Sequence, residues 1–443
     1  MILQRAVLGV GVLLLGGCAY HNVVYNAERL YEEAETHRRA GRTGLSTARY
    51  QDVARKTGQA LRARPASDWR FEALFLLGRA HVRLGDPGAA GAALREVALG
   101  APDETMRGGA LVYLAAVHDE LGEPTKALEA VDRALDGPLS PEVRAEAHLV
   151  RGRALLKGAQ ADEGSWELYR APTVDPRLRV EAGLERLRWS IVRGDREGSR
   201  YAMEGLLAYA EAGARADTIE ALALTARDRW GAGAAAELLS TVEAAHWERA
   251  VRGRLALRRA RLLHEAGGVG LATEAATRVA AGVGDAAAEA RLQLATWRLE
   301  RARDLADVYA VRGLLLPAGS DPRVAAALAA LDELESYVSR GLDDPLGWFA
   351  AAEIARDRLG AGYVARGLFL AYADGAPAQP WAPKALLAAL EISPEEADRA
   401  WLRARLETRR DNPYVLAAHG GSAAGFEALE EELDVRLREL SGR

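Results

Sequence analysis

Residues 71–102 have the sequence FEALFLLGRAHVRLGDPGAAGAALREVALGAP, in which two helical patterns flank a break. The first pattern has one stripe at helical spacing, made of Leu74, Leu77, His81 and Leu84. Gly85 can adopt the positive φ that ends a helix, and Pro87 can open the next helix. Since two helices alone cannot bury both of their faces, this hairpin predicts neighbours of the same kind.

The landmarks of this hairpin occur again 37 positions along the chain. The matched pairs are Gly85 and Gly122, Ala90 and Ala127, and Leu74 and Leu111. Gly152 lies two such periods after Gly78, at the equivalent position. In these residues the chain resembles the tetratricopeptide repeat (TPR), a hairpin of about 34 residues that stacks into a solenoid. The resemblance implies an all-α fold, an α-solenoid of stacked antiparallel helical hairpins that forms a TPR-like superhelix.

The composition agrees with a helical chain. Hydrophobic residues make up 49% of the 443 residues, but aromatic residues only 6%. Abundant Ala, Leu, Arg and Glu favour helix, and few β-branched runs are present to form strands. The net charge of −5 gives no support to nucleic-acid binding.

Residues 1–17 have the pattern of a signal peptide, with Arg5 before an apolar run from Ala6 to Leu15. This run is shorter than the roughly 20 residues of a membrane-spanning helix. The sequence Leu15-Gly16-Gly17-Cys18 resembles the bacterial lipobox, which implies cleavage before Cys18 and lipidation of that residue. Ala19 after the cysteine implies sorting to the outer membrane, with the chain facing the periplasm, and the inner membrane is the alternative. An ordinary signal peptide with an incidental cysteine is the alternative to lipidation.

A helical pair is expected over residues 25–39 and 47–64, and it carries many basic residues. These are Arg38, Arg39, Arg42, Arg49, Arg55, Lys56, Arg62 and Arg64. Two interpretations are open. The cluster could lie on anionic lipid headgroups near the anchor, or it could be a solvated helix face.

We divide the chain as follows: 1–17 signal peptide, 18–64 anchor and helical pair, 65–160 TPR repeats, 161–343 degenerate repeats, 344–392 a further repeat block, and 393–443 capping helices. Helix starts are expected where a capping side chain precedes proline, at Ser140, Asp175, Asp321, Asp344 and Ser393. The loops at Gly282 and Gly319 are the expected joints. The last helix should present the stripe Phe426, Leu429, Leu433 and Leu437.

The sequence contains none of the catalytic, phosphate-binding or metal-binding motifs that we sought. We therefore expect no enzyme, no cofactor, no metal and no catalytic residue. His81 and His118 lie 37 positions apart and are interpreted as packing residues rather than ligands.

The TPR resemblance implies an inner groove lined by the first helix of each hairpin. The positions that it assigns to the groove are Phe75, Arg79, Arg83, Val112, Ala116, Glu120, Leu149, Arg153 and Lys157. Apolar side chains flanked by Arg or Lys could hold a peptide with acidic residues. An ordinary solvated face is the alternative.

These features predict a non-enzymatic, lipid-anchored scaffold that binds an envelope protein or peptide in its groove. The architecture is similar to that of the TPR lipoprotein of the outer-membrane barrel-assembly machinery, which implies a role in outer-membrane protein assembly. One alternative is a periplasmic coordinator of cell-wall synthesis or division, related to the partners of the Tol-Pal system. Another is a superhelical cell-wall lytic enzyme, which needs a catalytic glutamate in a sugar cleft.

Overall fold

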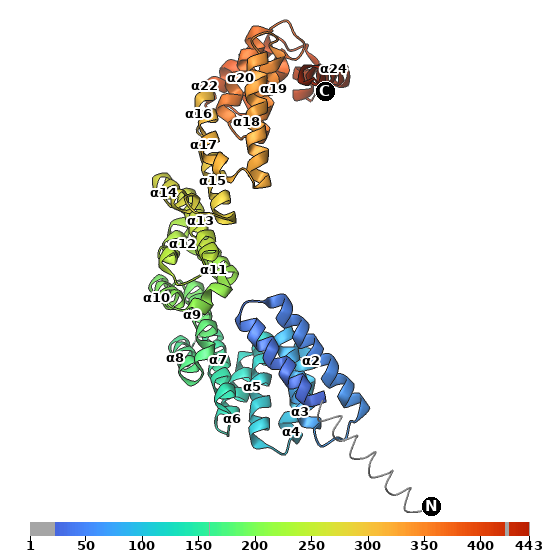
Figure 1. Cartoon of the computed structure of the whole chain (residues 1–443), viewed down its shortest axis with the longest axis vertical. Helices are drawn as coiled ribbons and strands as arrows, with labels where there is room; N and C mark the ends of the chain where they lie inside the picture. Colours follow the sequence, from blue (N-terminus) through green and yellow to red (C-terminus); the bar gives the residue numbers. More distant parts are fainter. Residues whose placement is uncertain (1–22, 159, 421–424, 443) are drawn as a thin grey trace, which may run out of the picture. The chain divides into compact units, whose positions relative to one another are not determined.

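The computed structural model describes residues 23–158, 160–420 and 425–442 (Figure 1), and all of its regular structure in these ranges is helical. Two compact units divide between Ala266 and Gly267. The expected signal peptide and Cys18 lie outside the described residues. Within the described ranges no helix has the length and apolarity needed to cross a bilayer.

In the first unit, a helix over residues 23–39 shares an apolar cluster with the next helix, and further hairpins follow in chain order. Their helices are α2 (Thr43–Ala63), α3 (Arg70–Leu84), α4 (Pro87–Gly100), α5 (Glu104–Glu120), α6 (Pro124–Leu135), α7 (Pro141–Lys157), α8 (Ala161–Val174), η1 (Pro176–Leu178), α9 (Arg179–Arg193), α10 (Arg196–Leu207), η2 (Ala210–Arg215), α11 (Ala216–Trp230), α12 (Ala232–Leu238), η3 (Val242–Ala244) and α13 (Arg249–Glu265).

The second unit continues in the same way and has its own apolar core. Its helices are α14 (Val269–Ala280), α15 (Asp285–Leu299), α16 (Leu305–Ala310), α17 (Arg312–Leu315), η4 (Leu316–Ala318), α18 (Pro322–Arg340), α19 (Leu346–Glu353), η5 (Ile354–Arg358), α20 (Gly362–Gly375), α21 (Ala382–Glu391), α22 (Glu396–Glu407), α23 (Pro413–Ala418) and α24 (Phe426–Ser441).

The glycine turns of the repeat have the same geometry in successive hairpins. Gly85 and Gly122 have φ values of 70° and 73°. The residue after each glycine donates its N–H to a carbonyl one turn back, Asp86 to His81 at 3.0 Å and Glu123 to His118 at 2.9 Å. This arrangement satisfies the last carbonyls of the helix and turns the chain into the next one. The predicted period is therefore confirmed in three dimensions.

The small and apolar landmarks also occupy equivalent places. Ala90 and Ala127 are both fully buried, and Leu74 and Leu111 contribute to one core. A Cβ added to Gly78 would lie 2.5 Å from Leu94, so close packing of α3 on α4 requires glycine there. The predicted all-α stack of antiparallel hairpins is confirmed, and the chain is a TPR-like helical repeat protein.

The sequence predicts positions for several helix starts, for a joint in the chain and for the last helix. Ser140, Asp175 and Asp321 accept hydrogen bonds from backbone amides at helix starts, as predicted. Ser393 instead donates to the Ala389 carbonyl at 2.6 Å, and α22 begins only at Glu396. The units divide before Gly282 and Gly319, at a Gly267 turn with φ of 80°. In α24, Leu433 is buried and the other stripe residues pack on the core of the second unit, which confirms the predicted apolar face.

Candidate functional site

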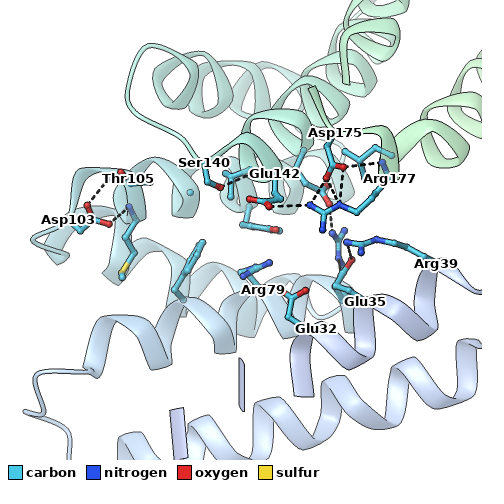
Figure 2. Close-up of a pocket in the computed structure, with 18 residues that line it drawn as sticks. Glu32, Glu35, Arg39, Arg79, Asp103, Thr105, Ser140, Glu142, Asp175 and Arg177 are labelled. Carbon is cyan, nitrogen blue, oxygen red and sulfur yellow. Dashed lines mark hydrogen bonds and ion pairs between the residues drawn. The ribbon is translucent and has the colours of Figure 1, made fainter. Parts of the chain in front are cut away.

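A pocket of about 420 Å³ lies in the first unit, where successive first helices face the helix over residues 23–39 (Figure 2). We call it the first-helix pocket. That helix, α3, α5, α7 and η1 contribute its lining, which includes Phe75, Arg79 and Arg83 of the predicted groove. The hairpin repeat therefore brings side chains of consecutive hairpins to one place, as the TPR resemblance implied.

Arg79 is held among aromatic rings in this pocket. Its guanidinium carbon lies 4.0 Å from the centroid of the Tyr31 ring, and 5.5 Å and 5.3 Å from the Phe75 and Tyr113 centroids. The ring faces stabilise the cation without neutralising it. Among the described residues no carboxylate forms an ion pair with Arg79, and its Nε atom is buried without a hydrogen-bond partner.

Glu35, by contrast, is the centre of a buried ion-pair network on the pocket wall. Its carboxylate accepts hydrogen bonds from Arg38 at 2.8 Å, Arg83 at 2.9 Å and the Tyr50 hydroxyl at 2.7 Å. Burial alone would raise the pKa of Glu35, but Arg83 and Arg38 hold it well below its ordinary value. Arg83 also donates to Glu146 on α7, whose pKa is lowered by the same arginine against the effect of burial.

The end of the helix over residues 23–39 also contacts α9. Arg38 donates to Glu181 there, and Arg215 lies 3.6 Å from the same carboxylate. At the turn after this helix, a Cβ on Gly41 would meet the Ala214 carbonyl oxygen at 2.2 Å, so the backbones approach closely. The first described helix therefore reaches a hairpin far along the chain, and the first-helix pocket lies beside this contact.

A smaller cavity of about 200 Å³ adjoins the first-helix pocket and shares Arg83, Tyr113 and Glu146 with it. Its lining includes further residues assigned to the groove, Val112, Ala116, Glu120 and Arg153. Burial raises the pKa of Glu120, and Asp119 beside it adds to that effect. Arg153 lies 3.4 Å from the Asp119 carboxylate and 3.9 Å from Glu185.

Two assigned residues lie elsewhere. Leu149 is only 4% exposed and packs in a core with Leu156 and Leu168, because the next hairpin covers it. Lys157 donates to the backbone carbonyl of Asp119 at 2.8 Å and pairs with its carboxylate at 2.7 Å. The groove is thus less basic than the sequence suggested, since Arg83, Arg153 and Lys157 all have carboxylate partners. Of these four basic residues, only Arg79 has no carboxylate partner within the described part of the chain.

The other candidate residues have structural partners as well. His81 and His118 each lie beside an acid of the following turn, Asp86 at 3.3 Å and Glu123 at 2.7 Å, so each packs against the turn that ends its helix. In the basic N-terminal pair, Arg38 and Arg39 contact Glu35. That part of the cluster points into the protein and not to a membrane.

Sequence reasoning missed Tyr31, Tyr113, Glu35 and Glu146. A tyrosine or glutamate on a helix has no distinctive spacing, and Arg83, which joins Glu35 and Glu146, lies 48 and 63 positions from them. Among the described residues no group of three or more His, Cys, Asp and Glu side chains could hold a metal ion.

Comparisons with known proteins assign the chain to no family. No protein-family model matches it, and no curated protein matches it. Among solved structures it is similar to PilW, described as a widely conserved type IV pilus biogenesis factor, with 18% identity and a TM-score of 0.36 over 49% of this chain and 92% of PilW.

It is also similar to a tetratricopeptide repeat protein from Parabacteroides merdae ATCC 43184, with 17% identity and a TM-score of 0.33 over 57% of this chain and 91% of that one. A third similarity is to Naa15/Naa10 bound to HypK-THB, with 15% identity and a TM-score of 0.22 over 96% of this chain and 88% of that one. At these values the likeness concerns the helical fold alone.

Proposed function

We propose that this protein is a non-enzymatic TPR-like scaffold that binds a segment of another protein in the first-helix pocket. The observation that carries the proposal is Arg79, a cation inside a 420 Å³ pocket with aromatic neighbours and no carboxylate partner among the described residues. A carboxylate on a partner would meet a pre-oriented guanidinium there, which is a strong, directional interaction.

The lining defines the kind of segment that fits. Phe75 and Val143 offer apolar surface, whereas Glu32 and Glu142 are exposed acids of the same pocket, Glu142 lying 3.3 Å from Arg177. In Figure 2 Glu32 and Arg79 lie on one side of the pocket, opposite Glu142. We therefore propose a segment of mixed charge, with an acidic group on Arg79, an apolar side chain beside it and basic groups toward the two glutamates.

Capture of partners tests this function. The variant Arg79→Gln keeps a polar side chain but removes the charge, and Arg95→Gln removes an exposed arginine of α4 outside the pocket. Affinity capture from detergent-solubilised envelopes should recover a discrete partner with the wild type and Arg95→Gln, and much less of it with Arg79→Gln. Equal recovery by all three proteins would refute the assignment.

We further propose that Cys18 carries lipid and tethers the scaffold to the bacterial outer membrane, facing the periplasm. The support is the Leu15-Gly16-Gly17-Cys18 pattern, and a role in outer-membrane protein assembly is the form of the proposal that we favour. Metabolic labelling with a palmitate analogue should mark the wild type and not Cys18→Ser. A label that persists in that variant would contradict lipidation at Cys18.

The alternative of a coordinator of cell-wall synthesis or division differs in the partner captured, not in the pocket. Identification of the captured protein separates the two roles. A digestion assay on muropeptides would reveal the lytic-enzyme alternative, for which we expect no activity.

A further inference from the structure

A second cavity, of about 510 Å³, lies between the end of the helix over residues 23–39 and the segment from η1 to η2. Its volume is within the range of small-molecule sites in proteins. It shares Arg39 and Arg177 with the first-helix pocket but otherwise has its own lining. We call it the arginine cavity.

The cavity combines an apolar surface with cationic groups. Ala40, Pro176, Val180 and Ala214 contribute apolar surface. Four guanidinium groups, those of Arg39, Arg177, Arg179 and Arg215, share the lining with only two carboxylates, Glu181 and Glu211. A site of this composition suits a molecule that has one anionic end and one apolar end.

Two of the four arginines already have close partners. Arg177 is paired with Asp175 at 2.8 Å, and Arg179 is paired with Glu211. The other two, Arg39 and Arg215, come from different elements, and their positive charges have only distant or shared carboxylate partners. Arg39 lies 3.4 Å from Glu35 and has a buried Nε without a hydrogen-bond partner.

Arg215 lies 3.6 Å from the Glu181 oxygen that already accepts from Arg38, which is beyond ordinary hydrogen-bond distance. Burial lowers the pKa of Arg215, and the nearby positive charge of Arg38 lowers it further, although Glu181 opposes both effects. The cavity therefore holds a cation that the surrounding carboxylates stabilise incompletely.

We infer that the arginine cavity binds an amphiphilic carboxylate, a monoanion whose head is held by Arg39 and Arg215 and whose chain covers Pro176, Val180 and Ala214. Guanidinium groups recognise a carboxylate through paired hydrogen bonds, and the apolar wall removes the chain from water. Glu181 and Glu211 on the same lining disfavour a ligand with more than one negative charge. Because Arg39 and Arg177 line both cavities, Arg215, which lines only the arginine cavity, is the residue that distinguishes this site from the first-helix pocket.

Titration calorimetry of the purified full chain with octanoate, below the concentration at which octanoate forms micelles, tests the inference. Octanoate should bind with one site per chain, whereas octanol and octylammonium should not bind. Absence of octanoate binding to the wild type, or equal binding of octanol, would overturn the proposal.

Variants locate the binding. Arg215→Gln and Arg39→Gln should each weaken octanoate binding by about tenfold, since each removes a charge-assisted interaction. Arg215→Lys should recover part of the loss, because it keeps the charge but not the paired geometry. Arg188→Gln is the matched control, since Arg188 is exposed and outside the cavity. If Arg215→Gln does not fold, the test rests on Arg39→Gln alone. Binding of octanoate to Arg39→Gln with the affinity of the wild type would refute the site.

Discussion

Glu35 illustrates how a single side chain can organise this protein at the residue scale. It is nearly fully buried, yet Arg38, Arg83 and Tyr50 satisfy its carboxylate. Through Arg83 it is linked to Glu146, and through Arg38 to Glu181, so one carboxylate connects the first described helix with α3, α7 and α9.

Replacing Glu35 by Gln should lower the free energy of unfolding by about 3–5 kcal/mol, because Arg38 and Arg83 would each lose one of their two carboxylate partners while their charges stay buried. The exposed pair Glu33–Arg49 offers a control, and Glu33→Gln should change the stability by less than about 1 kcal/mol. Urea unfolding followed by far-UV circular dichroism measures both. Similar losses in the two variants would contradict a central role for Glu35.

The same carboxylate predicts a dependence on pH. Because the pKa of Glu35 is lower in the folded protein than in the unfolded chain, its stabilising contribution is complete above about pH 4.3 and is lost as the pH falls below that value. The stability difference between the wild type and Glu35→Gln should therefore be largest at neutral pH and should shrink at pH values below about 4. Urea unfolding of both proteins across this range measures it, and a difference that grows on acidification would show that the sign is wrong.

At the scale of the element, glycine turns determine where the first helix of a hairpin ends and the second begins. The structure has Gly85, Gly122 and Gly194 in left-handed conformations at the ends of α3, α5 and α9, and each turn directs the chain into the next helix. The sequence alone predicted helix ends at all three glycines, since helix ends of this kind depend on residues close together in the chain.

Replacing Gly122 by Ala should destabilise the protein by about 1–2 kcal/mol, since an alanine is strained at a φ of 73°. Gly205 within α10 is the matched control, because a Cβ there meets nothing within 4 Å. Gly205→Ala should leave stability unchanged or raise it by up to about 1 kcal/mol. Thermal unfolding compares the two variants, and equal effects would show that the turn geometry is not required.

What sequence reasoning could not find has a common physical origin. The contact of Arg38 with Glu181 joins residues 143 positions apart, and no local pattern marks it. Leu149 was assigned to the groove by its repeat position, but the later hairpin at Ala182 covers it. Arg79 and Phe75, in contrast, were assigned to the groove by their repeat positions, whereas the aromatic neighbours Tyr31 and Tyr113 were not.

At the scale of the whole molecule, the chain consists of two units, of which the second has one apolar core of its own and the first has several apolar clusters. The core of the second unit extends from Ala288 to Leu433, and all of its members among the described residues lie after Gly267. A unit whose core is complete can fold without its neighbour.

Residues 267–443 expressed alone should therefore be helical and should unfold cooperatively. Circular dichroism gives the helix content, and a thermal scan gives the transition. A fragment that binds the dye ANS and melts without a transition would mean that the first unit is needed for its packing.

Site-specific photo-cross-linking in cells tests the central claim, that the first-helix pocket holds a protein partner. A photoreactive amino acid at Thr105, an exposed residue of the pocket, is compared with one at Leu99, which is 87% exposed on α4 outside the pocket. We predict a discrete adduct from Thr105 that disappears with Arg79→Gln, and none of the same mass from Leu99. The same adduct from both positions, or one from Thr105 that persists in Arg79→Gln, would contradict the account.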